Sequence, residues 1–233
     1  MKIGILETGR PSAALEERFG RYDAMMMRLL GEHEQFRTYA VTAGDYPERP
    51  EDQDAYVITG SAAGVYDGHP WIPGLKVFLQ KSKGKAKLVG ICFGHQIMAE
   101  AFGGRVEKSD KGWGVGLHRY EVREVAPWMN SVDGFSIPVS HQDQIIRQPP
   151  QSRVVAASSF TRFGVLAYSD QPAISFQCHP EFEPDFARAL IEERRDRVPE
   201  PDNAIASLGQ PNDGPLVGSW IRQFLNGSAA ADA

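Results

Sequence analysis

Cysteine is scarce in this chain of 233 residues, which has only Cys92 and Cys178. Two cysteines cannot build the framework of bridges found in small secreted domains, so no disulfide scaffold is expected. The N-terminal residues 1–7 also lack the long apolar run and the small-residue cleavage site of a signal peptide. These absences predict a cytoplasmic protein.

Long apolar runs and blocks of basic residues are missing as well. Glycine, proline or a charged residue interrupts even the most apolar segments within about ten residues, whereas a membrane helix needs about 20 apolar residues. The chain has 25 lysines and arginines against 30 aspartates and glutamates, a formal net charge of −5. We therefore expect neither a membrane nor a nucleic acid as a partner, because phosphate backbones are bound by clustered positive charge.

Short apolar runs alternate with helical patterns in the first half of the chain, and this alternation is typical of an α/β protein. Apolar content of 42% with 24% charged residues is typical of a soluble globular protein. We expect a single doubly wound, flavodoxin-like domain over residues 1–226, with a mostly parallel central sheet, helices on both faces, and a flexible C-terminal tail over 227–233. The predicted strands are 2–6, 36–42, 55–59 and 87–91, and the predicted helices are 12–29 (capped by Ser12), 73–83 and 93–102.

The second half predicts an additional β-rich segment. Few helical patterns fit between residues 105 and 177, where β-type segments follow one another. They lie around Val106 and over 117–122, 136–140, 154–157, 165–168 and 173–177; a helix over 184–195, a surface loop over 196–215 and a short helix over 216–225 follow.

Cys92 stands between a buried strand and a helix that begins at Phe93. Gly90 and Gly94 lie two residues to either side, and small residues there permit the sharp strand-to-helix turn known as a nucleophile elbow. At a helix N-terminus, backbone N–H groups and the helix dipole favour a thiolate. The segment predicts a reactive cysteine, although an inert core cysteine after a strand is the alternative.

A histidine and a carboxylate follow the predicted strand 173–177. The two-residue period of a strand places His179 and Glu181 on the same side, and Pro180 is suited to ending the strand. Functional residues of doubly wound sheets gather at the carboxyl ends of strands, so Cys92 and His179 are expected to meet. Cys92 would be the nucleophile, His179 the general base and acid, and Glu181 the group that fixes the imidazole tautomer. Taken alone, His179 could merely be hydrogen-bonded at the strand end.

Two motifs together carry a family resemblance: Gly-Ile-Cys-Phe-Gly-His-Gln over 90–96 and Gln-Cys-His-Pro-Glu over 177–181. In order and separation they resemble the paired signatures of class I (triad-type) glutamine amidotransferases. Val-Ile-Thr-Gly-Ser over 57–61 resembles the oxyanion loop of that family. Ser-His-Gln-Asp over 140–143 resembles a stretch of the amidotransferase domain of GMP synthetase. The resemblance covers about residues 2–195.

The resemblance implies cleavage of a γ-glutamyl amide through a thioester on Cys92, with no cofactor and no metal. It implies a backbone oxyanion hole at Gly60, Ser61 and Phe93. The residues that it implies for substrate binding are Gln96, His141, Gln142 and Asp143. Two positions depart from the pattern: Ser61 replaces a usual glycine, and Cys178 replaces a usual phenylalanine, where we expect a packing residue without a bond to Cys92.

Three functions remain open from the sequence. The chain lacks an ATP-pyrophosphatase-like Ser-Gly-Gly-x-Asp-Ser segment, so it is expected to hydrolyse glutamine alone or to supply ammonia to a separate synthetase subunit. The second is a free-standing γ-glutamyl peptidase acting on γ-glutamyl peptides or glutathione conjugates, because Gly60-Ser61, Tyr66-Asp67 and Trp71-Ile72 resemble that branch. The third is a non-catalytic binding module.

Other candidates predict ordinary structure. His33, His69 and His118 lack metal-ligand spacing, and the glycines of 112–116 lack the lysine and helix of a phosphate-binding loop. Trp71 is expected to pack rather than to line an entrance. Whether 196–215 covers the site as a lid is left open.

Overall fold

The computed structural model describes residues 1–31 and 34–227, in which five parallel strands form one half of a nine-stranded sheet. Their order is β2-β1-β3-β4-β11, which is the 2-1-3-4-5 order of flavodoxin-like sheets with β11 as the fifth strand. The predicted fold class is therefore confirmed. The strands are β1 (Lys2–Glu7), β2 (Gln35–Ala40), β3 (Ala55–Ile58), β4 (Lys87–Ile91) and β11 (Ala173–Phe176).

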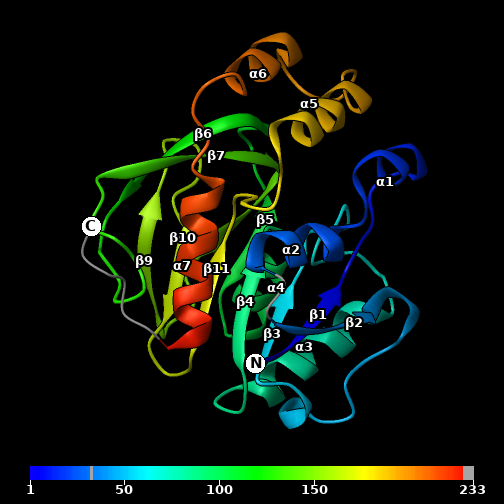
Figure 1. The fold of residues 1–233 in the computed structure, drawn as a ribbon, viewed down its shortest axis with the longest axis vertical. Coiled ribbons are helices and arrows are strands. Elements are labelled where there is room, and N and C mark those ends of the chain that lie inside the picture. Colours follow the sequence, from blue (N-terminus) through cyan, green and yellow to red (C-terminus); the bar gives the residue numbers. More distant parts are fainter. Residues whose placement is uncertain (32–33, 228–233) are drawn as a thin grey trace.

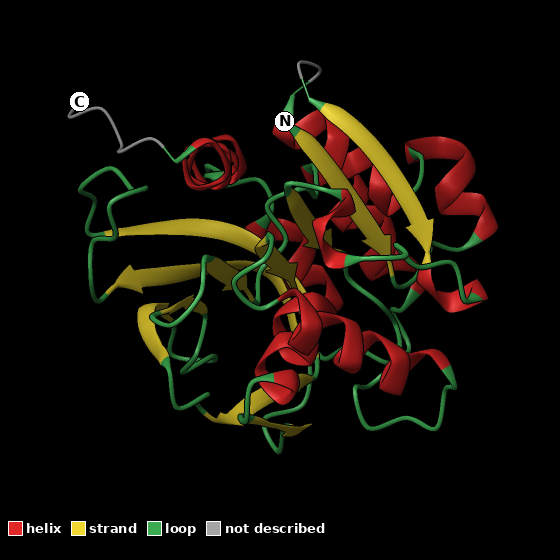
Figure 2. Cartoon of the chain, turned by 90° about the horizontal axis from the view of Figure 1, so that it is seen from below, coloured by secondary structure: helices red, strands yellow, loops and turns green. Residues whose placement is uncertain are grey.

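The β-rich half continues the same sheet with antiparallel strands in the order β11-β10-β9-β6-β7. Figure 2 shows this half as mostly strands and loops, whereas helices surround the parallel strands. The added strands are β6 (Gly114–Val122), β7 (Gly134–His141), β9 (Ser152–Ala157) and β10 (Val165–Tyr168), and a small separate sheet pairs β5 (Arg105–Lys108) with β8 (Asp143–Arg147).

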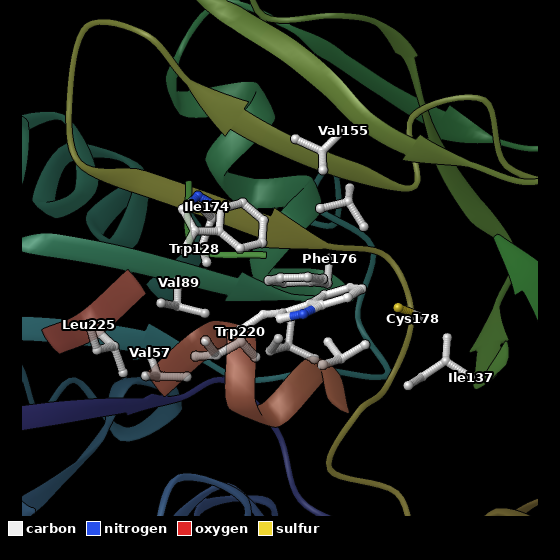
Figure 3. Packing of buried hydrophobic residues seen from close by; sticks show 14 of the residues in the cluster. Val57, Val89, Trp128, Ile137, Val155, Ile174, Phe176, Cys178, Trp220 and Leu225 are labelled. Carbon is white, nitrogen blue, oxygen red and sulfur yellow. The ribbon is translucent and has the colours of Figure 1, made fainter. Parts of the chain in front are cut away.

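Alternate residues of the parallel strands face two hydrophobic clusters. Ile5, Val57 and Val89 pack in one cluster with α2 and α7, and the next residues along, such as Leu6 and Ile58, pack in the other with α3 and α4. Figure 1 shows α7 crossing the front of the sheet, and Figure 3 shows Trp220 of α7 beside Phe176 and Val89. The helices of these two layers are α2 (Tyr22–Leu30), α3 (Trp71–Ser82), α4 (Phe93–Ala101) and α7 (Gly214–Asn226).

The expected single helix over 12–29 is wrong. Two helices form, α1 (Ala13–Phe19) and α2, because Gly20 has φ +85°, a conformation that ends a helix. The Ser12 side chain accepts a hydrogen bond from the Leu15 N–H, as expected of an N-cap.

The loop expected over 196–215 is also wrong, since it contains α6 (Pro201–Ser207). Pro201 suits the first turn, where its missing N–H costs nothing. The helix packs on β6, where the Ser207 hydroxyl accepts from the Leu117 N–H, and it follows α5 (Pro184–Glu193) above the sheet (Figure 1). Strand β8 was not expected either, because its segment has only two adjacent apolar residues, Ile145 and Ile146.

Two expectations fall on residues outside the described part of the chain. The tail over 228–233 and His33 lie outside the described residues, while Gly227 caps α7 in a left-handed conformation. In the part of the chain that the structure describes, no helix has the length and apolar character to cross a membrane. The single domain over 1–226 stays a prediction.

Candidate active site

Cys92 lies at a tight connection between β4 and α4. Its φ of 51° and ψ of −101° are rarely adopted by a residue with a side chain, and Glu200 is the other such residue with positive φ in the described chain. The Cys92 N–H donates to the Phe176 carbonyl of β11 at 2.8 Å. Backbone strain of this kind costs about 1–3 kcal/mol and is held by the surrounding structure.

The glycines around Cys92 are required by close packing. A Cβ atom on Gly94 would lie 2.3 Å from the Ile58 carbonyl oxygen of β3, and one on Gly90 would lie 2.6 Å from the Gly94 carbonyl group. Contacts this short are repulsive with backbone atoms, which cannot move aside cheaply. Glycine at both positions therefore lets α4 approach the sheet closely enough to place Cys92 at its edge.

His179 and Glu181 follow β11, as expected, but they lie in a turn, so the two-residue period of a strand does not extend to them. The strand ends at Phe176, and the Phe182 N–H donates to the His179 carbonyl. His179 Nδ1 lies 2.8 Å from Glu181 Oε1, and both side chains are buried. The imidazole also stacks on the Phe182 ring at 3.9 Å between centroids. The turn therefore produces the pairing that strand periodicity predicted.

Gly60, just beyond the end of β3, lies between the Cys92 and His179 segments, and its lack of a side chain leaves room for both. A Cβ atom on Gly60 would lie 3.1 Å from His179 Cε1 and 3.8 Å from Cys92 Cβ. Gln177 Nε2 lies 3.7 Å from Cys92 Sγ, and Gln96 donates to Gln177 Oε1 at 3.2 Å. The loops after β3, β4 and β11 thus meet around one sulfur atom, as the carboxyl ends of parallel strands allow.

The surroundings of His179 favour its charged form. Burial alone lowers the pKa of His179, but the charges of Glu181 and Cys92, and the hydrogen bonds that they make with His179, outweigh burial and raise the pKa to about 10. A protonated imidazole beside a thiol stabilises the thiolate, which is the nucleophilic form of cysteine. The arrangement of the three side chains suits nucleophilic attack.

The backbone at Gly60–Ser61 is oriented by two buried hydroxyls. Thr8 Oγ1 lies 2.9 Å from the Thr59 carbonyl oxygen and 3.2 Å from that of Gly60, and Thr59 Oγ1 also lies 3.2 Å from the Gly60 oxygen. In a trans peptide the next N–H points away from the carbonyl, so the Ser61 N–H is turned from the hydroxyls and donates to no other described residue. The Phe93 N–H, at the first position of α4, is likewise unused by the helix.

Ser61 fits the loop despite replacing a usual glycine. Its hydroxyl accepts the Ala63 N–H at 3.2 Å, which closes a short turn. Its Cα passes close to Gly9, where a Cβ atom would lie 3.0 Å away. The segment after β1 and the loop after β3 therefore support each other.

A cavity of about 410 Å³ opens above Cys92. Gln96, His141, Gln142 and Asp143 line it together with Ser61, whereas His179 and Glu181 are not among its lining residues. Burial lowers the pKa of His141 to about 3, so this ring is neutral at neutral pH, and its Nδ1 lies 3.1 Å from the Asp143 carbonyl oxygen. The residues proposed to bind substrate are thus at the opening over the sulfur.

Several lining residues were not predicted from the sequence. Tyr66 donates to Asp143 Oδ1 at 2.8 Å, and Arg194 donates to Ser140 Oγ at 3.0 Å. Tyr66, Asp67 and Ser140 had a usable signal, because they belong to segments with a family resemblance, whereas Lys108, Arg194 and Arg197 come from segments with no motif. Thr8, which is not part of the lining, had a signal as well, because it follows the first predicted parallel strand. The additional lining residues are Ala62, Ala63, Gly64, Tyr66, Asp67, Lys108, Trp113, Ser140, Arg194 and Arg197.

The remaining candidates take structural positions. Cys178 is a free thiol buried in the apolar cluster, near Ile137 in Figure 3, and Cys92 is also free. Trp71 packs 5.3 Å from the Phe93 ring and does not line the cavity. His118 packs against Phe160. Among the described residues, no group of three or more His, Cys, Asp and Glu side chains could hold a metal.

Comparison with known families shows which family the chain resembles. The sequence profile described as "Glutamine amidotransferase class-I" matches residues 37–194, more than half of the chain. The chain belongs to the class-I glutamine amidotransferase family. The resemblance expected from the two motifs is therefore confirmed.

Relatives and a solved structure show the breadth of the likeness. The chain is 30% identical to gamma-glutamyl peptidase 2 of Arabidopsis thaliana over 82% of this chain and 80% of that protein. It is 29% identical to a glutamine-hydrolyzing GMP synthase subunit of Ignicoccus hospitalis over 70% and 84% of the two chains. The crystal structure of a glutamine amidotransferase from Thermotoga maritima superposes with a TM-score of 0.74 at 17% identity, over 97% and 98%, which supports the fold.

Proposed function

We propose that the protein hydrolyses γ-glutamyl amides through a thioester on Cys92. The observation that carries this proposal is the convergence of Cys92, His179 and Glu181 beneath an open cavity, with His179 bonded to Glu181 at 2.8 Å. Family membership supports the reaction class. Cys92 is the nucleophile, His179 the general acid and base, and Glu181 the group that orients the imidazole.

The first half of the reaction forms the thioester. The Cys92 thiolate attacks the side-chain carbonyl carbon, and the backbone N–H groups of Ser61 and Phe93 stabilise the resulting oxyanion. His179 then gives its proton to the leaving nitrogen, the C–N bond breaks, and ammonia or an amine departs. Glu181 keeps the imidazole in place while this happens.

The second half releases glutamate. A water molecule enters, His179 removes one of its protons, and the hydroxide attacks the thioester carbonyl. The C–S bond breaks and the Cys92 thiolate is restored. Gln96, His141, Gln142 and Asp143, which line the cavity beside the sulfur, would orient the amino-acid end of the glutamyl group.

Glutamine is the simplest substrate of this chemistry. The relation to the GMP synthase subunit of Ignicoccus hospitalis supports a role in which the released ammonia passes to a separate synthetase. This version predicts a low glutaminase rate that rises by orders of magnitude when the partner is added.

A second candidate, γ-glutamyl peptide hydrolysis, is favoured by a specific observation. The cavity over Cys92 has a volume of about 410 Å³ and three basic side chains in its wall, at Lys108, Arg194 and Arg197. The relation to gamma-glutamyl peptidase 2 supports the same reaction class. This version predicts fast cleavage by the isolated chain. A non-catalytic binding module is disfavoured, because the three side chains are already assembled.

Labelling with a glutamine analogue that carries an electrophilic carbon in place of the amide tests the common chemistry. We expect peptide mapping to find the label on Cys92 and on no other residue, with Cys92→Ala unlabelled. Cys178→Ala is the matched control, since it removes the buried cysteine and should be labelled like the wild type. A folded protein that is never labelled at Cys92 would disprove the proposal.

A panel of glutamine, γ-glutamyl dipeptides and glutathione conjugates separates the two candidates. The compounds are incubated with the isolated chain, and glutamate release is measured for each. Glutamine turnover that needs a second protein supports the amidotransferase role, whereas unaided peptide cleavage supports the peptidase.

A further inference from the structure

The cavity wall has more positive than negative charge. Lys108, Arg194 and Arg197 line it with only two aspartates, Asp67 and Asp143. The proposed Cys92 thiolate also lines it, but the charged imidazole of His179 beside it balances that charge, so the wall keeps one net positive charge. None of the three basic groups has a carboxylate within ion-pair distance in the described chain. His141 adds no charge at neutral pH, since burial lowers its pKa to about 3. The wall is therefore suited to an anionic ligand.

Arg194 is held in place by uncharged groups. It donates one N–H to Ser140 Oγ at 3.0 Å, and its guanidinium carbon lies 5.8 Å from the centre of the Trp113 ring. A guanidinium has five N–H donors in a planar fork, so several remain for a ligand. A fork that is already oriented loses little entropy when it binds a carboxylate with two parallel hydrogen bonds.

Arg197 is brought to the same wall by the turn after α5. Its N–H donates to the Arg194 carbonyl at 2.8 Å, and both side chains line the cavity. Arg195, which lies between them in sequence, is instead engaged with Glu192 and Asp202. Arg194 and Arg197 thus line the cavity without a carboxylate partner. Arg195 lies outside the cavity and forms ion pairs.

The substrate of the proposed reaction determines which anion fits. Glutamine has one ammonium and one carboxylate group, so its net charge is zero. A γ-glutamyl dipeptide has a second carboxylate on the leaving amine, so its net charge is −1. The wall charge of +1 complements the dipeptide and not glutamine.

We propose that Arg194 and Arg197 form a subsite for a carboxylate of the leaving amine. The preferred substrates are then γ-glutamyl peptides whose leaving amino acid or peptide has a free carboxylate, and glutamine is a poor substrate. This inference rests on the proposed γ-glutamyl hydrolysis and assigns its specificity. The glutamyl group's own α-carboxylate is the other source of the same chemistry, and substrates that lack the second carboxylate distinguish the two.

Three compounds with one γ-glutamyl group test the subsite: γ-glutamylglycine, γ-glutamyl methylamide and glutamine. We expect kcat/KM for γ-glutamylglycine to exceed that for the methylamide by about tenfold or more, since a hydrogen bond to a charged group is worth about that much. In Arg194→Gln and Arg197→Gln, this ratio should fall about tenfold. The matched control is Arg195→Gln, which should keep the wild-type ratio, and thermal melting of each variant reports folding.

Charge reversal sharpens the same test. Arg197→Glu should lower the rate on γ-glutamylglycine and raise the rate on the γ-glutamyl amide of ethylenediamine, which presents a positive charge at a similar distance. A variant that merely distorted the site would lower both rates.

The outcomes distinguish a failure of the leaving-group subsite from a failure of the proposed γ-glutamyl hydrolysis. If the wild type cleaves all three compounds with equal efficiency, or if the arginine variants lose equal activity on all three, the leaving-group subsite is wrong and the hydrolase remains. In the second case the arginines act on the glutamyl group that all three compounds share, and not on the leaving amine. If the wild type cleaves none of the compounds, the proposed function fails and the subsite fails with it.

Discussion

The two segments that meet at the sulfur reach their geometry by different means. The segment around Cys92 is strained: Cys92 has φ 51°, and glycines at 90 and 94 let α4 lie against β3 and β4. The segment around His179 has no positive-φ residue in the turn 177–182 and is positioned by contacts with other parts of the chain. The His179 N–H donates to the Pro138 carbonyl, and the His179 ring stacks on Phe182.

This difference shows that local sequence sets the conformation of the elbow, whereas tertiary contacts set that of the His179 turn. The conformation of the elbow follows from a short stretch of sequence and from one close approach between a helix and a sheet. The His179 turn depends on β7, on α5 and on the ring of Phe182, which packs in turn on Phe186 at 4.5 Å. We expect changes in the elbow to act on folding through steric repulsion, and changes in the turn to act mainly on activity.

The largest expected effect is a loss of catalytic rate when His179 or Glu181 in the turn 177–182 is replaced. His179→Ala should lower kcat by about 10³-fold or more, because it removes the proposed general base and acid. Glu181→Ala should cost less, because its proposed role is only to orient and stabilise the imidazole. Both are measured as kcat on the best γ-glutamyl substrate. Equal losses would show that Glu181 does more than orient His179.

A smaller effect is expected on stability at the elbow. Gly94→Ala places a methyl group 2.3 Å from the Ile58 oxygen and should destabilise the protein by about 3 kcal/mol or more. The control is Gly68→Ala, where nothing lies within 4 Å of the added methyl group and little change is expected. Denaturant unfolding measures both. A Gly94→Ala variant as stable as the control would mean that α4 can move away from the sheet.

The pH dependence of stability should differ between the histidines. Burial lowers the pKa of His179, but Glu181 and Cys92 raise it overall to about 10, so its contribution is complete below about pH 6.5 and is lost as pH rises through about 10. His141 has its pKa lowered to about 3 by burial, so it destabilises the protein as pH falls from about 6.5 towards 3. Each slope is at most about 1.4 kcal/mol per pH unit.

Unfolding free energies measured across this range should show both slopes. His179→Gln should flatten the alkaline one. His141→Gln should make the acidic one shallower, and the remainder comes from His95, whose pKa burial also lowers to about 3. An alkaline slope that is unchanged in His179→Gln would show that another group causes it.

The smallest effect is expected from Thr8, the residue after β1, whose hydroxyl contacts the Gly60 loop beside Cys92 and His179. Thr8→Val keeps the shape of the side chain but removes the hydroxyl near the Gly60 carbonyl, so the Ser61 N–H should be less well oriented. We expect kcat to fall about tenfold with little change in KM, since the interaction is made in the transition state. Thr8→Ser, which restores the hydroxyl, should recover most of the rate. An equal rise in KM would indicate a binding role instead.

Much of the fold could be predicted because the parallel strands carry the signal in themselves. Buried runs such as 55–58 and 87–91 are apolar on both faces, and only a sheet covered by helices on two sides buries them. The break at Gly20 and the helix α6 were missed because an apolar stripe runs through Gly20, and because the residues that bury α6 lie on the distant strand β6. Local pattern does not report such contacts.

The sequence by itself determined the elbow and the choice of Cys92, His179 and Glu181 as one group, because these residues stand in short motifs whose steric and chemical demands are local. Only the tertiary structure decided what surrounds that group. Lys108 ends β5, Trp113 precedes β6, and Arg194 and Arg197 lie in the turn after α5, so no short segment contains more than two of them. Their meeting at one cavity depends on how the sheet twists and how α5 packs above it, and burial of apolar surface across the whole chain decides both.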